Sequence, residues 1–260
     1  DGATRSLAAR AATFEPTGPI EIRARSAAVP AWTASATPGE RPVAAGAQHT
    51  GPFVGRDREL QELIGLFDGV VHDRRARLVS ITGIAGIGKS RLAWDVQSGL
   101  DQRPDLVAWH AGRAPAYGEE ITFAAVAEMV RRRIRAPVGS APDITRRQLK
   151  ASLDELVRDE DERRWVEPRL GALLGSERLD AFDRDELFSA WRRFFEHVAE
   201  SSPVVLVFED LQWADPALVD FVEHLGAWAR HHPILLVTLA RAELLDRPPG
   251  WGAGAGRFPS

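Results

Sequence analysis

Apolar and polar residues alternate along most of the chain with periods that distinguish helices from strands. Residues 77–82 predict a short strand that leads into a glycine-rich turn and an amphipathic helix. Residues 122–201 have mostly helical spacing, with breaks near residues 137–142 and 171–180. Residues 56–71 predict a helix with an apolar face made of Leu60, Leu63, Ile64, Phe67 and Val71.

Three further runs predict strands, at residues 106–111, 203–208 and 233–239. Residues 203–208 are apolar at every position, which is typical of a strand buried on both faces of a parallel sheet. Asp215 and Pro216 predict a helix start, as an N-cap followed by proline in the first turn. Strands that alternate with helices predict an α/β fold with a parallel sheet, and the long helical stretch predicts a helical insertion.

The first 50 residues have a different texture. Residues 14–19 predict a turn, residues 20–25 a half-buried strand, and residues 29–32 a short edge strand. A unit that ends near residue 33 is too short to bury a core of its own. Residues 34–50 are rich in Ala, Pro, Gly, Ser and Thr and predict a linker, so we expect the main domain to span residues 51–260.

Composition narrows the possible function classes. The 260 residues carry a formal charge of -4, which excludes a strongly basic nucleic-acid binder as a description of the whole chain. The chain has no Cys, so it has no disulfide framework, thiolate nucleophile or Cys-based zinc site. It has no apolar run of about 18 residues, so we expect no membrane span and a cytoplasmic location. Only two of the 33 basic residues are lysine, Lys89 and Lys150.

Residues 83–90 match the phosphate-binding pattern G-x-x-x-x-G-K-[ST]. The glycines let successive backbone amides point into one concavity, and the following helix adds the positive end of its dipole. Lys89 would supply a point charge for the β and γ phosphates, and the Ser90 hydroxyl would ligate Mg²⁺. Ala85 excludes the dinucleotide fingerprint, which needs glycine at that position. The motif and its context predict the three-layer α/β/α fold of P-loop nucleoside triphosphatases.

Glu209 and Asp210 end the apolar strand at residues 203–208, where a phosphate loop needs a carboxylate to hold Mg²⁺ and activate water. The alternative is that this acidic pair merely marks the point where the strand meets solvent. The usual order places Asp first, so which carboxylate serves which role stays open. Asp215 fits an N-cap and a site role equally well.

Other charged clusters have simpler explanations. Arginines at residues 131–135 and 146–147 lie in amphipathic helices of an acidic protein, which favours solvated faces over direct nucleic-acid binding. His231 and His232 lack partner ligands for a metal. The guanine signature N-K-x-D is absent, so ATP is favoured over GTP.

From Gly51 onward the chain resembles the signal-transduction ATPases with numerous domains, the STAND class of AAA-type P-loop ATPases. The resemblance rests on residues 53–60, the phosphate loop, Tyr117-Gly118, residues 209–215 and residues 238–241. It implies that Phe53, Val54, Gly55 and Arg56 wrap the adenine side of ATP. It also implies a sensor position near the γ-phosphate for Arg241.

We therefore expect ATP and Mg²⁺ as cofactors, with the following residues at the site. The expected catalytic residues are Glu209, Asp210 and Arg241, and the expected metal ligands are Ser90, Glu209 and Asp210. The remaining expected nucleotide contacts are Phe53, Val54, Gly55, Arg56, Gly83, Ile84, Ala85, Gly86, Ile87, Gly88, Lys89, Ser90 and Arg91.

Residues 1–33 resemble the C-terminal tail of class III adenylate/guanylate cyclase domains, from Phe14-Glu15-Pro16 to Val29-Pro30-Ala31-Trp32. A cyclase followed by a STAND ATPase is a bacterial fusion order, and the cyclase catalytic residues would precede Asp1. A STAND module continues into a fifth strand, a helical lid and a winged helix. The resemblance thus implies a domain cut short at Ser260, with an exposed edge at residues 77–82 and weakened ATP binding.

These features predict a regulatory ATPase module, a molecular switch in a multidomain signalling protein. Its expected partners are the nucleotide and the rest of its own polypeptide, with room for a homo-oligomer. A P-loop small-molecule kinase, the ATPase core of a LuxR-type transcriptional activator, and a nucleotide-binding scaffold without turnover remain as alternatives.

Overall fold

The structure of the chain is a computed structural model that describes residues 13–20, 29–35, 55–103, 106–115 and 122–246. The chain divides into two units, Asp1–Thr50 and Gly51–Ser260. Within the described residues, no helix is both long enough and apolar enough to cross a membrane.

The first unit contains a two-stranded antiparallel ribbon of β1 (Thr13–Ile20) and β2 (Val29–Ser35). β2 confirms the strand expected at residues 29–32. The turn expected at residues 14–19 is wrong, because this segment pairs with β2 through an irregularity between Pro16 and Gly18. Both strands of such a ribbon are edges, where a proline without an amide hydrogen is tolerated. Of the strand expected at residues 20–25, only Ile20 is described, at the end of β1.

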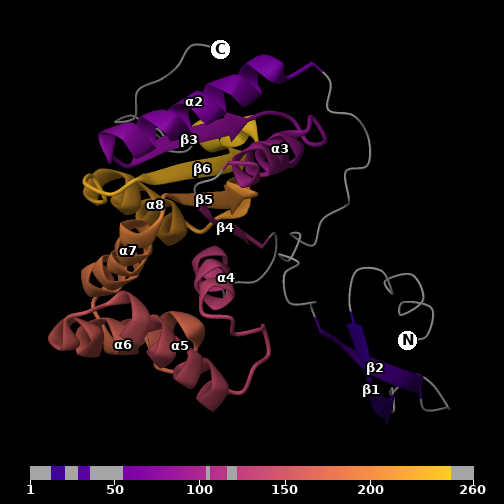
Figure 1. The fold of residues 1–260 in the computed structure, drawn as a ribbon, viewed down its shortest axis with the longest axis vertical. Helices are drawn as coiled ribbons and strands as arrows, with labels where there is room; N and C mark the ends of the chain where they lie inside the picture. Colours follow the sequence, from indigo (N-terminus) through magenta and orange to yellow (C-terminus); the bar gives the residue numbers. More distant parts are fainter. Residues whose placement is uncertain (1–12, 21–28, 36–54, 104–105, 116–121, 247–260) are drawn as a thin grey trace. The chain divides into compact units, whose positions relative to one another are not determined.

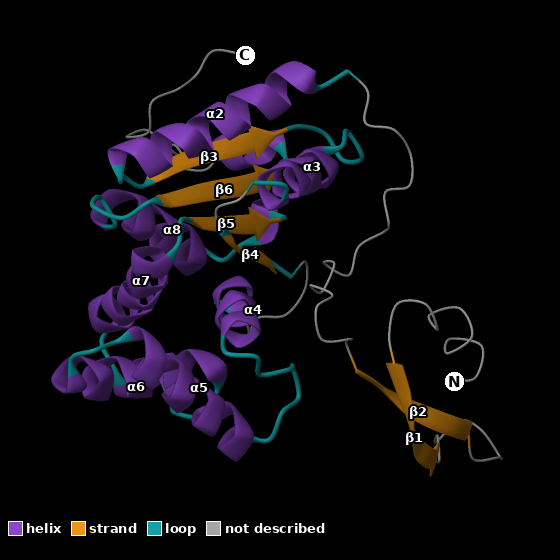
Figure 2. Cartoon of the chain, viewed as in Figure 1, coloured by secondary structure: helices purple, strands orange, loops and turns teal. Residues whose placement is uncertain are grey.

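The second unit is built on a four-stranded sheet in which all paired strands are parallel. Figure 2 shows the arrows of β3, β6 and β5 pointing the same way, so their carboxyl ends share one edge of the sheet. The spatial order of the strands is β3-β6-β5-β4. The strands are β3 (Arg77–Thr82), β4 (Ala108–Arg113), β5 (Val204–Glu209) and β6 (Ile234–Ala240).

One face of the sheet is covered by α2 (Asp57–Asp73) and α3 (Lys89–Asp101), on the β3 side in Figure 1. Apolar side chains at helical spacing on these helices, such as Phe67 and Val96, share one buried cluster with Val207 and Val237 of the central strands. The strand residues alternate, as the pleat of a sheet requires, so their neighbours point to the opposite face.

The opposite face carries α4 (Ala124–Arg133), α7 (Arg184–Ser201) and α8 (Pro216–Trp228), and α5 (Pro142–Leu156) and α6 (Glu160–Leu174) pack with them in one core. Helices therefore cover both faces, which confirms the predicted α/β fold with a helical insertion. The described part of this unit also contains three short 3₁₀ helices: η1 (Leu179–Ala181), η2 (Leu211–Trp213) and η3 (Ala242–Asp246).

Aromatic side chains form the centre of the helical layer. Trp191 is fully buried and lies edge-on to Phe123 and Phe221, with ring centroids 4.7 Å and 5.4 Å away. Its indole nitrogen donates to the carbonyl oxygen of Arg169 at 2.9 Å, so the polar atom of this buried side chain has a partner. We refer to Phe123, Phe188, Trp191 and Phe221 as the aromatic cluster.

The predicted breaks near residues 137–142 and 171–180 are present in the helical stretch, but a third break was missed. Helix α5 ends at Leu156 and α6 begins at Glu160. Asp159 caps α6 by accepting a hydrogen bond from the amide of Glu162 at 2.8 Å. The acidic run Asp159–Glu162 is a helix-start signal because carboxylates favour the first turn. Strand β4 also begins two residues later than the expected strand at residues 106–111.

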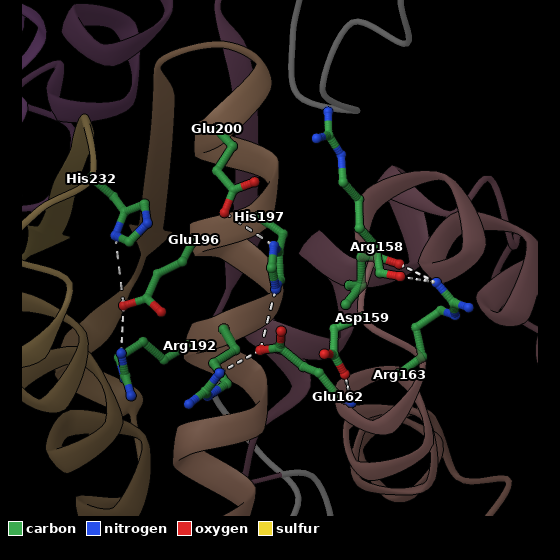
Figure 3. Close-up of polar contacts among 11 residues, drawn as sticks. Arg158, Asp159, Glu162, Arg163, Arg192, Glu196, His197, Glu200 and His232 are labelled. Atoms are coloured by element: carbon green, nitrogen blue, oxygen red, sulfur yellow. Dashed lines mark hydrogen bonds and ion pairs between the residues drawn. The ribbon is translucent and has the colours of Figure 1, made fainter.

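Polar contacts hold α6 against α7 (Figure 3). His197 lies between Glu162 and Glu200, at 3.3 Å and 3.2 Å from their carboxylate oxygens. Burial by itself would raise the pKa of Glu162, but hydrogen bonds from Arg193 and His197 outweigh it and hold that pKa below its usual value. This group joins α6 and α7, and none of its residues belongs to the phosphate loop.

Candidate functional site

The carboxyl edge of the sheet brings three predicted segments together. Thr82 pairs with Ala240, and Phe208 pairs with Thr238, so the residues that follow β3, β6 and β5 lie side by side. The amide of Gly83 donates to the carbonyl oxygen of Ala240 at 3.2 Å. Because neighbouring strands lie about 4.8 Å apart, the phosphate loop and the acidic end of β5 are separated by about 10 Å, the space occupied by β6.

The loop between β3 and α3 has the backbone shape that its glycines permit. Gly86 and Gly88 have φ values of 77° and 99°, in the left-handed region that favours glycine. Gly88 directly precedes α3, and no side chain caps the first amides of that helix. The uncapped amides and the positive end of the helix dipole favour an anion at this position.

Two cations reach the same loop. The Nζ atom of Lys89 donates to the carbonyl oxygens of Gly83 and Ile84, at 2.8 Å and 3.0 Å. The Nη2 atom of Arg56 donates to the carbonyl oxygen of Ile87 at 3.2 Å. Both side chains therefore already rest on the loop, and their charges add to its preference for an anion.

The other residues expected to contact the nucleotide differ in their surroundings. Ser90 is exposed in the first turn of α3. Arg91 bonds Asp95 on the same helix, from Nε to Oδ2 at 2.7 Å. Gly55 has a φ of 84° just before Arg56. The predictions for Phe53, Val54, Tyr117 and Gly118 lie outside the described residues.

The acidic end of β5 is engaged by an arginine that sequence analysis did not single out. Arg113 ends β4 directly opposite Glu209 and donates from Nη2 to its Oε2 atom at 2.7 Å. The Nε atom of Arg113 also lies 3.4 Å from Oδ2 of Asp210. The signal that could have identified Arg113 is its position just after a predicted strand. The carboxyl ends of parallel strands share one edge of the sheet, so this position lies at the same edge as Glu209 and Asp210.

The electrostatics of this group follow from its contacts. The hydrogen bond to Glu209 raises the pKa of the Arg113 guanidinium above its already high usual value. The side chain of Glu209 is 18% exposed and that of Arg113 is 58% exposed, so water reaches the pair mainly from the arginine side. One cation therefore binds both carboxylates that the sequence predicted for the site.

Arg241 is the remaining expected site residue, and Asp215 is the residue for which the sequence left an N-cap and a site role open. Arg241 follows β6, and its amide donates to Oε1 of Gln212 at 3.1 Å. Its guanidinium lies 5.5 Å from the centre of the Trp213 ring. Asp215 accepts a hydrogen bond from the amide of Ala217 at 2.8 Å and caps α8, which supports the N-cap interpretation of this residue.

Comparison with known proteins identifies one matching family. Residues 52–237 match the AAA ATPase domain family, well over half of the chain. No curated protein sequence matches the chain. Among solved structures, the chain is similar to one in "Structure of Drosophila ORC bound to poly(dA/dT) DNA and Cdc6 (conformation 1)", with 17% identity and a TM-score of 0.34. The match covers 72% of this chain and only 25% of that one. On the family match and the phosphate loop at the sheet edge, the chain belongs to the AAA ATPase domain family.

Proposed function

We propose that this chain is a regulatory ATPase module that binds ATP with Mg²⁺ at the carboxyl edge of its sheet and hydrolyses it slowly. The observation that carries the proposal is the hydrogen-bonded adjacency of the phosphate loop, the end of β6 and the acidic end of β5. A phosphate cradle, an arginine and a carboxylate pair on neighbouring strands are the parts that phosphoanhydride hydrolysis requires.

Each side chain has a role that follows from its position. The backbone amides between Gly83 and Ser90 would bind the phosphates, and Lys89 would exchange its two carbonyl partners for phosphate oxygens. A carboxylate at the end of β5 would accept a proton from the attacking water. Arg241, at the end of β6, would stabilise negative charge that develops on the transferred group.

The residues present also fit Mg²⁺, which prefers hard oxygen ligands. The Ser90 hydroxyl and the carboxylates of Glu209 and Asp210 would hold the ion, which supplies charge neutralisation on the phosphates when bound. Among the described residues, no three acidic or histidine side chains gather as a metal site. Phosphate oxygens of the substrate and water would therefore complete the ligand shell.

We propose that Arg113 restrains the site through its contacts with Glu209 and Asp210. While its guanidinium binds Glu209 and lies beside Asp210, these carboxylates are less available to activate water or ligate a cation. The pair is partly exposed, so its strength is modest and the energy of nucleotide binding is sufficient to break it.

We further propose that the module is of the STAND class and acts in a larger cytoplasmic signalling protein. The support is the order of its sequence motifs and the resemblance of residues 1–33 to a cyclase tail. In this proposal, residues 51–260 gate an upstream nucleotidyl cyclase, and residues 34–50 link the two.

The first test exploits the two lysines of the chain. We expect Lys89→Ala to raise the dissociation constant for ATP about 10- to 100-fold, because it removes a charge-assisted contact to phosphate. Lys150→Ala, on an exposed position of α5, is the matched control and should leave the affinity unchanged. Equal affinity for ATP in both variants, measured by calorimetry, would refute the proposed function.

The second test concerns Arg113. Arg113→Met keeps the aliphatic stem and removes the charge, so we expect kcat for ATP hydrolysis to rise up to about fivefold, as expected for loss of a partly exposed ion pair. Glu209→Gln and Asp210→Asn, measured in parallel, should identify the base as the residue whose loss lowers kcat while ATP still binds. A fall in kcat for Arg113→Met would show that this arginine assists turnover and does not restrain it.

A further inference from the structure

Helix η2 follows the acidic end of β5 and contacts β6. Asp210 has a φ of 55°, a left-handed value that is uncommon outside glycine and turns the chain out of β5. The amide of Trp213 then donates to the carbonyl oxygen of Asp210 at 2.9 Å and closes the turn. Leu211 is fully buried and anchors η2 in the core. The next two side chains, Gln212 and Trp213, are thereby held at the sheet edge.

Gln212 connects Asp210 to Arg241. Its Oε1 atom accepts from the amide of Arg241 at 3.1 Å, and its Nε2 atom donates to Oδ1 of Asp210 at 3.3 Å. A backbone amide can only donate and an ionised carboxylate can only accept, so these two partners fix the orientation of the Gln212 amide. A glutamate at this position would lack the donor, and a leucine would lack both groups.

Trp213 contacts the other end of Arg241. The guanidinium carbon lies 5.5 Å from the centre of the indole ring, within the range of a cation–π contact. Trp213 is 47% exposed, whereas Trp191 of the aromatic cluster is fully buried, so core packing does not account for its position. The contact restricts the directions that the Arg241 side chain can take from the end of β6.

We propose that Gln212 and Trp213 are positioning residues that fix the location of Arg241 relative to Asp210 at the nucleotide site. Gln212 fixes the backbone of Arg241 relative to the acidic end of β5, and Trp213 fixes its guanidinium. This inference rests on the proposed function for its effect on turnover, while the contacts themselves are independent of that function. Neither residue needs to touch ATP, so their loss should change kcat more than the dissociation constant for ATP.

The main experiment measures ATP affinity and kcat for Trp213→Leu and Gln212→Leu. Each variant should lower kcat about 3- to 20-fold, from the loss of one cation–π contact or of the hydrogen bonds of one amide, with ATP affinity changed less than about threefold. Trp213→Phe should restore most of kcat, because it retains an aromatic face. Trp228→Leu, on an exposed tryptophan at the end of α8, is the matched control and should behave as the wild type.

Combination with Arg241→Ala tests whether Trp213 acts through the arginine. In the Arg241→Ala background, Trp213→Leu should have no further effect on kcat, since the side chain that it positions is already absent. A separate measurement on the nucleotide-free protein is hydrogen exchange at the Arg241 amide, which should accelerate in Gln212→Leu and not in Trp228→Leu.

The outcomes separate the two proposals. Suppose that the wild type binds and hydrolyses ATP but Trp213→Leu and Gln212→Leu match its kcat. The positioning role is then wrong, and the proposed function stands. The same conclusion holds if the effects of the Trp213 and Arg241 substitutions on kcat add fully. If the wild type does not bind ATP, the proposed function is wrong, and the role in turnover falls with it. Unchanged exchange at the Arg241 amide in Gln212→Leu would refute the Gln212 contact by itself.

Discussion

The aromatic cluster and the carboxyl edge of the sheet each contain a tryptophan, and the two tryptophans differ in burial and in contacts. Trp191 is fully buried, lies edge-on to two phenylalanines, and has its single polar atom bonded to a backbone carbonyl. Trp213 is 47% exposed and contacts a charged arginine beside the phosphate loop. Burial makes the first contact a source of stability, whereas the exposed second contact adds little stability and, in our proposal, orients the arginine side chain.

The same contrast extends to charged residues. Arg169, in the helical layer, contacts Glu186 at 3.0 Å and lies over the Trp165 ring with its side chain 12% exposed. Arg113, at the sheet edge, is 58% exposed while it binds Glu209. We therefore expect substitutions in the helical layer to lower the free energy of unfolding, and substitutions at the edge to change nucleotide binding or turnover at nearly constant stability.

The largest expected effect on stability is that of Trp191→Ala. It removes a fully buried side chain from the aromatic cluster and should lower the free energy of unfolding by about 3–5 kcal/mol. Trp228→Ala, at a tryptophan that is 65% exposed, should change it by less than about 0.5 kcal/mol. Urea denaturation measures both. The contrast between the regions fails if the folded Trp191→Ala protein has lost ATP affinity as Lys89→Ala does.

The next effect is a dependence of stability on pH that arises from His110 in β4. Burial, with a smaller contribution from Arg133 and Arg132, lowers the pKa of His110 from 6.5 to about 4. Between these values the unfolded chain binds a proton that the folded chain does not. Stability should therefore rise with pH from about 4 to 6.5 and be fully present above that range, with a total change of at most about 3 kcal/mol.

Denaturation of His110→Leu over the same pH range checks this origin. The free energy of unfolding of this variant should depend less on pH. The dependence that remains should come from His224, whose pKa is also lowered by burial. A profile as steep as that of the wild type would show that His110 is not the buried base.

The smallest of the three effects on stability is that of Gly112→Ala, in the strand that contacts both the helical layer and the carboxyl edge of the sheet. A Cβ atom at Gly112 would lie 2.1 Å from the carbonyl oxygen of Ala125, so Gly112→Ala must push β4 and α4 apart. We expect a loss of about 1–3 kcal/mol in the free energy of unfolding. Gly65→Ala, at an open position inside α2, is the control and should gain about 0.5–1 kcal/mol from helix propensity.

Gly112→Ala also sharpens the comparison, because its neighbour Arg113 binds Glu209. If displacement of β4 loosens that ion pair, kcat should rise as in Arg113→Met. Loss of stability with an unchanged kcat would indicate that the edge contact is independent of how β4 packs on α4.

Local sequence signals were sufficient for most of the fold. The expected strand at residues 77–82 coincides with β3, and the N-cap signal at Asp215 coincides with the start of α8. The errors occurred where tertiary pairing overrides local preference. The prolines and glycine of residues 14–19 favour a turn by themselves but lie in a strand because β2 pairs with them. Asp159, an N-cap within a long helical pattern, was missed because the apolar spacing continues on both sides.

The sequence by itself determined the chemistry that this protein can carry: a glycine-rich phosphate loop with one of its two lysines, an acidic strand end, and a family whose match covers most of the chain. These features depend on residues close together in the sequence, which share a local backbone shape. Only the tertiary structure decided which distant residues meet at the site. Arg113 reaches Glu209 across 96 positions of sequence, and Gln212 reaches Arg241 across 29. Such contacts arise from the order of the strands in the sheet, which spacing along the chain does not encode.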